Sequence, residues 1–295
     1  MIQKPFLKWV GGKTQLIDEI TNLIPNRMNN YHEIFVGGGS VLFLILSLQK
    51  ENKIKIKNKI YAYDLNSKLI NTYINIQNNN KKVYKYIEKY INEYENIKGD
   101  EINRNPKDLI EAKTSKESYY YYLRNIFNKL KDSDVKCSAL FIILNKLCFR
   151  GLYRESKNGF NVPFGHYKKT PSIISKDELN NISSLIKNVE FKCMDFNTSM
   201  KNIEKNDFVY LDPPYYPEDE KSFVGYTIDG FDKETHIKLF KNILSLKSSF
   251  LLSNSNVSFV NNYMKKYKIK KIECRRAINS KDPSAKTFEV LITNF

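Results

Sequence analysis

A strand, a glycine turn, a helix and a second strand can be read in residues 31–64, and no other feature of this 295-residue chain constrains its fold as strongly. Residues 31–35 predict a short buried strand, residues 36–40 contain three consecutive glycines, and the apolar run 41–48 predicts a helix. Residues 59–64 predict a second strand that ends in a carboxylate. Two strands joined through a helix lie parallel, because the crossover returns the chain to the same edge of the sheet. The sequence therefore predicts an α/β fold with a parallel sheet and crossover helices.

Strand-like runs return in the second half of the chain, after a long stretch of different character. Residues 66–170 carry polar helical segments rich in Tyr and Lys, and within them 148–169 is interrupted by glycines and a proline that predict a β-hairpin or an ordered loop. We expect two domains: a sheet domain formed by 1–65 and 171–295, and an inserted, mainly helical domain formed by 66–170. The expected strands of the second half are 189–194, 207–211, 250–253, 269–275 and 288–292, and a helix is expected near 233–244.

Net charge favours a polyanionic partner, although only weakly. The chain has 48 Lys and Arg against 32 Asp and Glu, a formal charge of +16, and such a positive field attracts nucleic acid. The alternative is that a genome rich in A and T enriches Lys, Asn and Ile, as in the low-information run 53–57. Charge alone does not decide between the two.

Cysteine and histidine spacing gives no metal or disulfide pattern. The four cysteines form no C-x-x-C pair and the three histidines lie far apart in sequence, so no metal is expected. No stretch approaches the ~18 apolar residues of a membrane helix, and the N-terminus lacks a signal-peptide pattern. We expect a soluble intracellular protein without a membrane partner.

The expected strand 207–211 ends in the segment Asp212-Pro213-Pro214-Tyr215. Open parallel sheets bind ligands at the carboxyl ends of their strands. The Asp212 carboxylate and the Pro213 carbonyl could accept hydrogen bonds from the exocyclic amine of adenine, and Tyr215 could stack on a base that has left the duplex. The alternative is an ordinary strand-ending turn. The segment predicts methylation of an exocyclic amine, with Asp212, Pro213 and Tyr215 as catalytic residues.

The glycine turn and the next acid suggest a nucleoside site. Glycines let the backbone at Phe35, Gly37 and Gly39 approach a bound adenosine closely. Asp64 ends the following strand near the ~20-residue offset at which an acid meets ribose hydroxyls in dinucleotide folds, although it could instead cap a helix. Gly12-Lys13-Thr14 matches the end of a phosphate-binding loop, but Leu7 stands where that motif needs glycine, which excludes a nucleotide triphosphatase.

Taken together, these segments resemble the DNA adenine methylase (Dam) family, the D12 class of N6-adenine-specific DNA methyltransferases. The resemblance implies a Rossmann-like methyltransferase sheet with helices on both faces, and a DNA target-recognition domain with a β-hairpin at 66–170. It also implies S-adenosyl-L-methionine as methyl donor and no metal. The motifs that carry it are 6–13, 35–40, 63–66, 151–154, 160–165 and 212–215.

The same resemblance implies roles for further residues. Arg154 would read a guanine edge, and Phe149 would insert beside the extruded base. The residues expected to contact S-adenosyl-L-methionine are Trp9, Lys13, Asp64, Asp195 and Asp212, in addition to Phe35, Gly37 and Gly39 of the glycine turn. The residues expected to face DNA are Lys8, Phe149, Arg150 and Arg154.

The expected function is site-specific DNA adenine-N6 methylation of a short duplex site, either GATC or another site such as CATG. Alternatives are N6 methylation of RNA, methylation of a glutamine amide in protein, and a non-catalytic DNA-binding protein on the same fold. Cytosine-C5 methylation is disfavoured, because none of the four cysteines follows a proline. We expect a cytoplasmic monomer that acts on double-stranded DNA, nucleoid-associated if bacterial or in the host cell if viral. A cognate restriction endonuclease as partner stays open.

Overall fold

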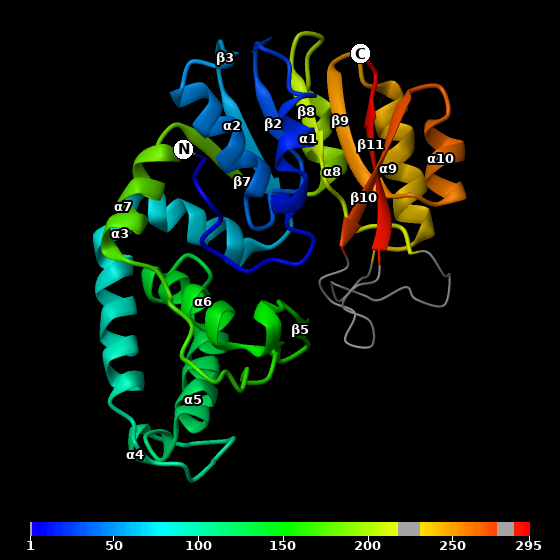
Figure 1. Ribbon diagram of the computed structural model, residues 1–295. Helices are drawn as coiled ribbons and strands as arrows, with labels where there is room; N and C mark the ends of the chain where they lie inside the picture. Colours follow the sequence, from blue (N-terminus) through cyan, green and yellow to red (C-terminus); the bar gives the residue numbers. More distant parts are fainter. Residues whose placement is uncertain (1, 218–230, 276–285) are drawn as a thin grey trace. The chain divides into compact units, whose positions relative to one another are not determined.

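The computed structural model describes residues 2–217, 231–275 and 286–295 and divides the chain into two compact units (Figure 1). The sheet unit is formed by Met1–Ile2, Lys13–Leu65 and Asn188–Phe295. The helical unit is formed by Gln3–Gly12 and Asn66–Lys187. None of the helices in the described part of the chain has the length and apolar character needed to cross a membrane.

The sheet unit is built on a seven-stranded sheet of order β10-β11-β9-β8-β2-β4-β7. The strands from β9 to β7 run parallel, and β11 pairs antiparallel with both β9 and β10. This sheet, flanked by helices, confirms the Rossmann-like α/β prediction. The strands are β2 (Tyr31–Glu33), β4 (Ile60–Asp64), β7 (Val189–Cys193), β8 (Phe208–Leu211), β9 (Ser249–Ser255), β10 (Lys268–Arg275) and β11 (Lys286–Thr293), with a separate parallel pair β1 (Arg27–Met28) and β3 (Lys55–Ile56).

Apolar sequence runs account for this core. All four residues of β8 are buried, which is typical of a central parallel strand covered on both faces. Helix α2 (Ser40–Lys50) follows the glycine turn and buries every residue of the run 41–48. The helix predicted near 233–244 is α9 (Lys233–Ser245). The remaining helices of the unit are η1 (Lys13–Leu16), α1 (Ile17–Thr21), α8 (Phe196–Ser199), η3 (Met200–Asn202) and α10 (Ser258–Met264).

The helical unit packs its long helix α3 (Ser67–Glu95) against α6 (Val135–Leu147) and α7 (Lys176–Leu185). Many of its tyrosines lie in the core, and two of the buried hydroxyls form hydrogen bonds: Tyr119 donates to Glu93 at 2.6 Å and Tyr120 to the Val162 carbonyl at 2.7 Å. The interrupted stretch contains the expected hairpin. The remaining elements are α4 (Leu109–Ala112), α5 (Lys116–Lys129), η2 (Phe149–Gly151), β5 (Glu155–Ser156) and β6 (Gly159–Phe160).

The helical unit extends further in sequence than the expected range 66–170. Residues 171–187 belong to it because α7 packs on α3, where the Gln77 side-chain amide donates to the Ile186 carbonyl at 2.8 Å. Residues 3–12 also belong to it. The Asn145 side chain of α6 accepts from the Lys8 backbone N–H at 2.8 Å and donates to the Lys8 carbonyl at 2.7 Å, as a neighbouring strand would.

We predict that Asn145→Ala destabilises the protein by about 2–4 kcal/mol, because Asn145 is 3% exposed and its loss leaves two backbone groups of Lys8 without these bonds. Urea denaturation measures the change. The control is Asn242→Ala, which removes one half-buried amide bond to Asn197 and should lower stability by about 1 kcal/mol or less. Equal losses in the two variants would contradict the bridging role.

Candidate active site

An ion pair lies at the end of β8. Lys13 Nζ is 2.7 Å from the Asp212 carboxylate, with the two side chains 4% and 19% exposed. The same ammonium lies 4.8 Å from the centre of the Tyr215 ring. Burial raises the pKa of Asp212 to about 6, although the Lys13 charge and hydrogen bond lower it. The structure thus brings Lys13, Asp212 and Tyr215 together at the sheet edge where parallel strands bind ligands.

Backbone anchors hold the loop that follows Asp212. A ring nitrogen of His236, on α9, lies 3.0 Å from the Pro214 carbonyl. The Tyr216 backbone N–H donates to the Asn254 side chain at 3.2 Å, and the Ser255 hydroxyl donates to the Tyr216 carbonyl at 2.5 Å. Helix α9 and strand β9 therefore fix the position of the loop on two sides.

Two acidic residues near the ion pair were not expected from the sequence. Glu289, on β11, accepts a hydrogen bond from the Tyr215 hydroxyl at 2.6 Å. Glu33, on β2, is buried and accepts a hydrogen bond from Tyr31 at 2.6 Å. Burial raises the pKa of Glu33 to about 8, so its carboxyl group is mostly protonated at neutral pH. The sequence signal that could have singled out Glu33 is an acidic residue in the middle of a segment predicted to form a buried strand.

The glycine turn and Asp64 meet directly. Gly37 and Gly39 have φ values of 47° and 75°, the left-handed region that favours glycine. The Gly37 backbone N–H donates to the Asp64 carboxylate at 3.0 Å. The alternative role of Asp64 as a helix cap is excluded, because the N-cap of α3 is Asn66, whose side chain accepts from Leu69 N at 2.9 Å.

Phe35 directly precedes the glycine turn, and Asp195 follows the end of β7. Both residues lie in the sheet unit. The Phe35 ring is 6.1 Å from the ring of Phe196, the first residue of α8. Asp195 caps α8, accepting from the Asn197 N–H at 2.9 Å and from the Thr198 hydroxyl at 2.6 Å. The Thr198 hydrogen bond lowers the pKa of Asp195. Since β4 and β7 are adjacent and parallel, Asp64 and Asp195 end up at the same sheet edge.

Trp9 lies in the helical unit, unlike the other residues expected to bind a cofactor. Lys8, which was expected to face DNA, lies in the helical unit as well. The Trp9 ring stacks on Tyr153 at 5.6 Å and on Phe141 at 6.2 Å. Lys8 Nζ lies 4.7 Å from the centre of the Tyr167 ring. Both side chains are therefore positioned by aromatic residues of the helical unit.

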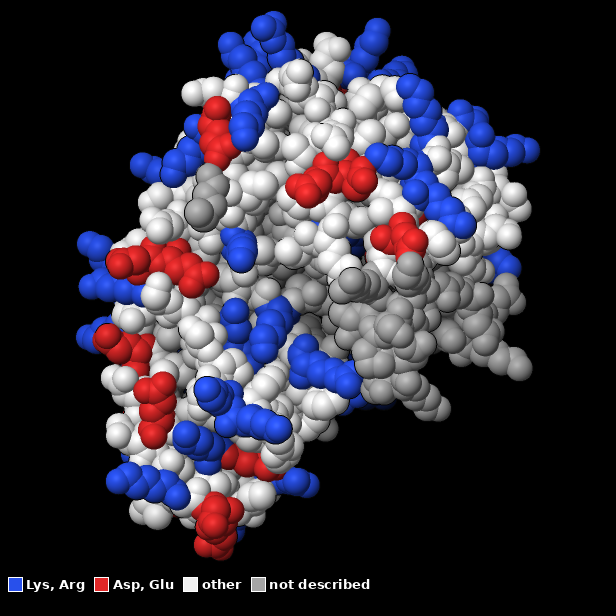
Figure 2. Space-filling view, in the orientation of Figure 1, with Lys and Arg blue, Asp and Glu red and all other residues white. Residues whose placement is uncertain are grey.

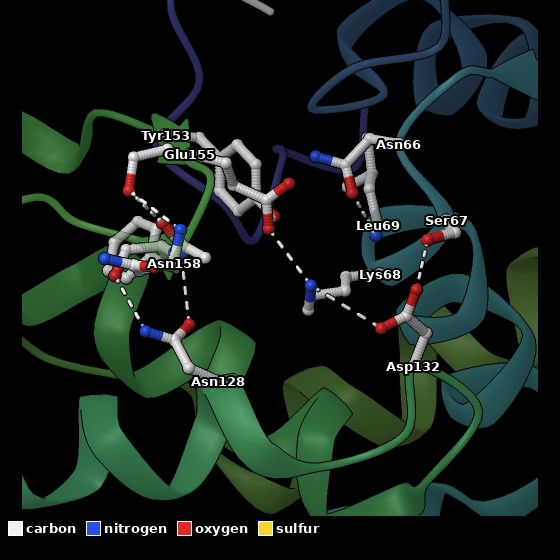
Figure 3. A network of polar contacts seen from close by, with 12 residues as sticks. Asn66, Ser67, Lys68, Leu69, Asn128, Asp132, Tyr153, Glu155 and Asn158 are labelled. Atoms are coloured by element: carbon white, nitrogen blue, oxygen red, sulfur yellow. Dashed lines mark hydrogen bonds and ion pairs between the residues drawn. The ribbon is translucent and has the colours of Figure 1, made fainter. Parts of the chain in front are cut away.

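The β-hairpin is tied to two helices by the polar network in Figure 3. Lys68, in the first turn of α3, lies 3.0 Å from Glu155 and 3.5 Å from Asp132. The Tyr153 hydroxyl donates to Glu155 at 2.7 Å. The Asn128 side chain of α5 accepts from the Phe160 N–H at 2.9 Å and donates to its carbonyl at 3.0 Å. Both hairpin strands are thus fixed to the helices behind them.

Of the residues expected to face DNA, Phe149, Arg150 and Arg154 are exposed on this part of the helical unit, and Lys8 is half-buried. Arg154 donates from Nε to the Asn161 side chain at 2.7 Å. Phe149 is 44% exposed, and the Arg150 guanidinium lies 5.2 Å from its ring centre. Arg150 has a φ of 57°, a strained conformation for a residue with a side chain. Lys and Arg side chains gather on the face of the helical unit that carries β5 (Figure 2).

No group of three or more His, Cys, Asp and Glu side chains that could hold a metal ion lies within residues 2–217, 231–275 and 286–295.

A parallel sheet with a glycine turn after its first strand, an acid at the end of the second and Asp-Pro-Pro-Tyr after β8 defines a Rossmann-like methyltransferase. The family model for D12 class N6 adenine-specific DNA methyltransferases matches residues 9–278, and the chain belongs to this family. It is an adenine-specific DNA methyltransferase.

Curated relatives support this assignment over nearly their full length. The chain is 37% identical to the type II methyltransferase M.MjaIII of Methanocaldococcus jannaschii, over 99% of each chain. It is 34% identical to the type II methyltransferase M1.LlaDCHI of Lactococcus lactis, over 99% of this chain and 95% of the relative. It is 31% identical to the DNA adenine methylase of Haemophilus influenzae, over 99% and 93%.

The position of Lys13 leads to a prediction on pH dependence. If Asp212 works as a carboxylate, methyl transfer at saturating substrates should fall as the pH drops through about 6. Because the Lys13 ammonium lowers the pKa of Asp212, Lys13→Gln should move this acidic limb to higher pH. The matched control is Lys270→Gln, which removes an exposed ammonium paired with Glu19. An acidic limb of the pH–rate profile that stays in place in Lys13→Gln would contradict the effect of Lys13 on the pKa of Asp212.

Proposed function

We propose that this enzyme transfers a methyl group from S-adenosyl-L-methionine to the N6 amine of an adenine extruded from a short duplex site. The observation that carries the proposal is the Asp212 carboxylate, paired with a buried lysine and adjacent to the Tyr215 ring at the end of β8. Family membership supports adenine in DNA as the acceptor. Three parts of the proposal go beyond family membership: the identity of the methyl donor, the extrusion of the base and the target sequence.

The glycine turn fits an adenosine-bearing donor. At Gly37 and Gly39 the positive φ values make any side chain unfavourable, so the backbone there stays open to close approach. Asp64, held by the Gly37 N–H, stands at the end of the next strand as ribose-binding acids do. When bound, S-adenosyl-L-methionine supplies an electrophilic sulfonium methyl group. The proposed contacts are Lys13, Phe35, Gly37, Gly39, Asp64, Asp195 and Asp212, and Trp9 stays a prediction of the same kind.

The residues of the loop after β8 would prepare the adenine amine for attack. The Asp212 carboxylate and the Pro213 carbonyl accept the two N–H groups, which localises the nitrogen lone pair toward the methyl group. Tyr215 stacks on the base and keeps it in the site. Methylation releases one proton from the amine, and a carboxylate with a pKa of about 6 can accept it at neutral pH.

The helical unit, including the predicted range 66–170, is proposed to recognise the DNA target. Arg154 stands on a hairpin fixed by the Lys68 network and could pair bidentately with guanine. Phe149 is an exposed ring on a strained corner, where a wedge into the duplex is sterically accessible. Lys8 and Arg150 would contact phosphates. The target is proposed as GATC or another short site containing adenine, such as CATG.

The names of two relatives as type II methyltransferases favour a role in restriction-modification. The proposal therefore includes a cognate restriction endonuclease that cuts the same site. It also includes a monomeric enzyme in the cytoplasm, associated with the nucleoid if bacterial or in the host cell if viral.

The central prediction concerns Asp212. Wild-type protein incubated with tritiated S-adenosyl-L-methionine and separate DNA, RNA and protein acceptors should label adenine in DNA. Asp212→Ala should keep measurable cofactor and DNA binding but fall below about a tenth of wild-type transfer, because the acceptor for the amine is gone. Label in RNA or protein alone, or an active Asp212→Ala variant, would overturn the proposed function.

A second prediction concerns site choice. Arg154→Ala should relax sequence preference while cofactor affinity stays unchanged, because a bidentate contact to guanine accounts for about 1–3 kcal/mol of discrimination. Lys157→Ala, in the same hairpin, removes a cation and should weaken DNA binding similarly at all sequences. Sequencing of modified adenines after exposure to each variant gives the preference. An unchanged site in Arg154→Ala would contradict the assignment.

A further inference from the structure

The Tyr215 ring is constrained at two points. Its hydroxyl donates to Glu289 Oε2 at 2.6 Å. Lys13 Nζ lies 4.8 Å from the ring centre and is itself paired with Asp212 at 2.7 Å. Since the tyrosine hydroxyl lies on the long axis of the ring, a hydrogen bond at that end fixes the direction of this axis and so the place of the ring.

Glu289 is well placed to hold that bond, because its backbone is paired on both sides. It lies opposite Ser255 of β9 and opposite Ile272 of β10. Ser255 is also the residue whose hydroxyl donates to the Tyr216 carbonyl. The side chain that fixes the ring and the side chain that fixes the following peptide thus come from paired positions of adjacent strands.

We propose that Glu289 is a positioning residue of methyl transfer: by accepting the Tyr215 hydrogen bond, it fixes the place of the ring on which the target adenine stacks. This inference rests on the proposed function, because it assigns a role within that same site. Glu289 touches neither the methyl group nor the adenine amine in this scheme. Its contribution is the alignment of the base, and a misplacement of about 1 Å can slow a reaction by about a hundredfold.

The charge of Glu289 gives a second, independent readout. Burial and the negative charge of Glu289 both raise the pKa of Asp212, whereas Lys13 lowers it. Removing the Glu289 charge should therefore move the acidic limb of the rate profile to lower pH, opposite in direction to Lys13→Gln. This shift reports how close the Glu289 charge lies to Asp212, whereas the rate of transfer reports the place of the Tyr215 ring.

The test compares single-turnover methyl transfer, at saturating cofactor and duplex DNA, in wild type and four variants. Glu289→Ala and Tyr215→Phe remove the same hydrogen bond, so each should slow transfer by about tenfold, with cofactor and DNA affinities within about twofold. The double variant should be no slower than either single one, because both remove one interaction. Glu289→Gln keeps an oxygen acceptor, so its rate should recover to within about threefold of wild type, with the acidic limb at lower pH.

The matched control is Glu273→Gln, which removes an exposed carboxylate from the adjacent strand β10 and should leave rate and profile unchanged. Wild-type rates in Glu289→Ala, additive losses in the double variant, or an unmoved limb in Glu289→Gln would overturn the proposal. If Glu289→Ala fails to fold by circular dichroism, Glu289→Gln and Tyr215→Phe decide. A wild type that does not methylate adenine in DNA refutes the proposed function itself, whereas an active wild type with indifferent Glu289 variants refutes only this inference.

Discussion

The ion pair between Lys13 and Asp212 is the interaction on which the rest of the site depends. A carboxylate buried at the end of β8 is unfavourable alone, and burial raises its pKa to about 6. The adjacent ammonium opposes that shift and keeps an anionic acceptor available near neutral pH. Lys13 also faces the Tyr215 ring, so one buried cation links the hydrogen-bond acceptor to the stacking surface. The parallel sheet supplies the common edge at which these groups meet.

The two units differ in how they hold the residues of their proposed sites. In the sheet unit, α9, β9 and β11 each contribute a side chain that immobilises the loop after Asp212, as expected where alignment governs rate. In the helical unit, the hairpin is equally well anchored through Lys68 and Asn128, yet the neighbouring corner at Arg150 retains backbone strain and an exposed ring. Strain of this kind persists only where the surrounding structure imposes it, and it often marks functional positions.

Sequence patterns predicted the sheet and its chemical edge because these features are local. The segments that became β2, β4, β7, β8 and β9 are short and contain aromatic or branched apolar residues, and Asp64 ends β4 whereas Asp212 directly follows β8. The partners Glu289 and His236 escaped prediction, because each lies in an ordinary strand or helix pattern and meets the loop only through tertiary pairing. The unit boundary at 187 was missed for the same reason: α7 is amphipathic, and only its packing on α3 assigns it to the helical unit.

The assignment of residues 3–12 to the helical unit has a consequence for how such enzymes can exchange parts. The polypeptide passes between the units after Ile2, after Gly12, after Leu65 and after Lys187, so the helical unit is not a simple insertion at one place in the chain. A chimera that transplanted only 66–187 from a relative would separate Asn145 from the backbone of Lys8 that it pairs with. Recombination that preserves the fold must carry the first dozen residues along, up to the junction that immediately precedes Lys13.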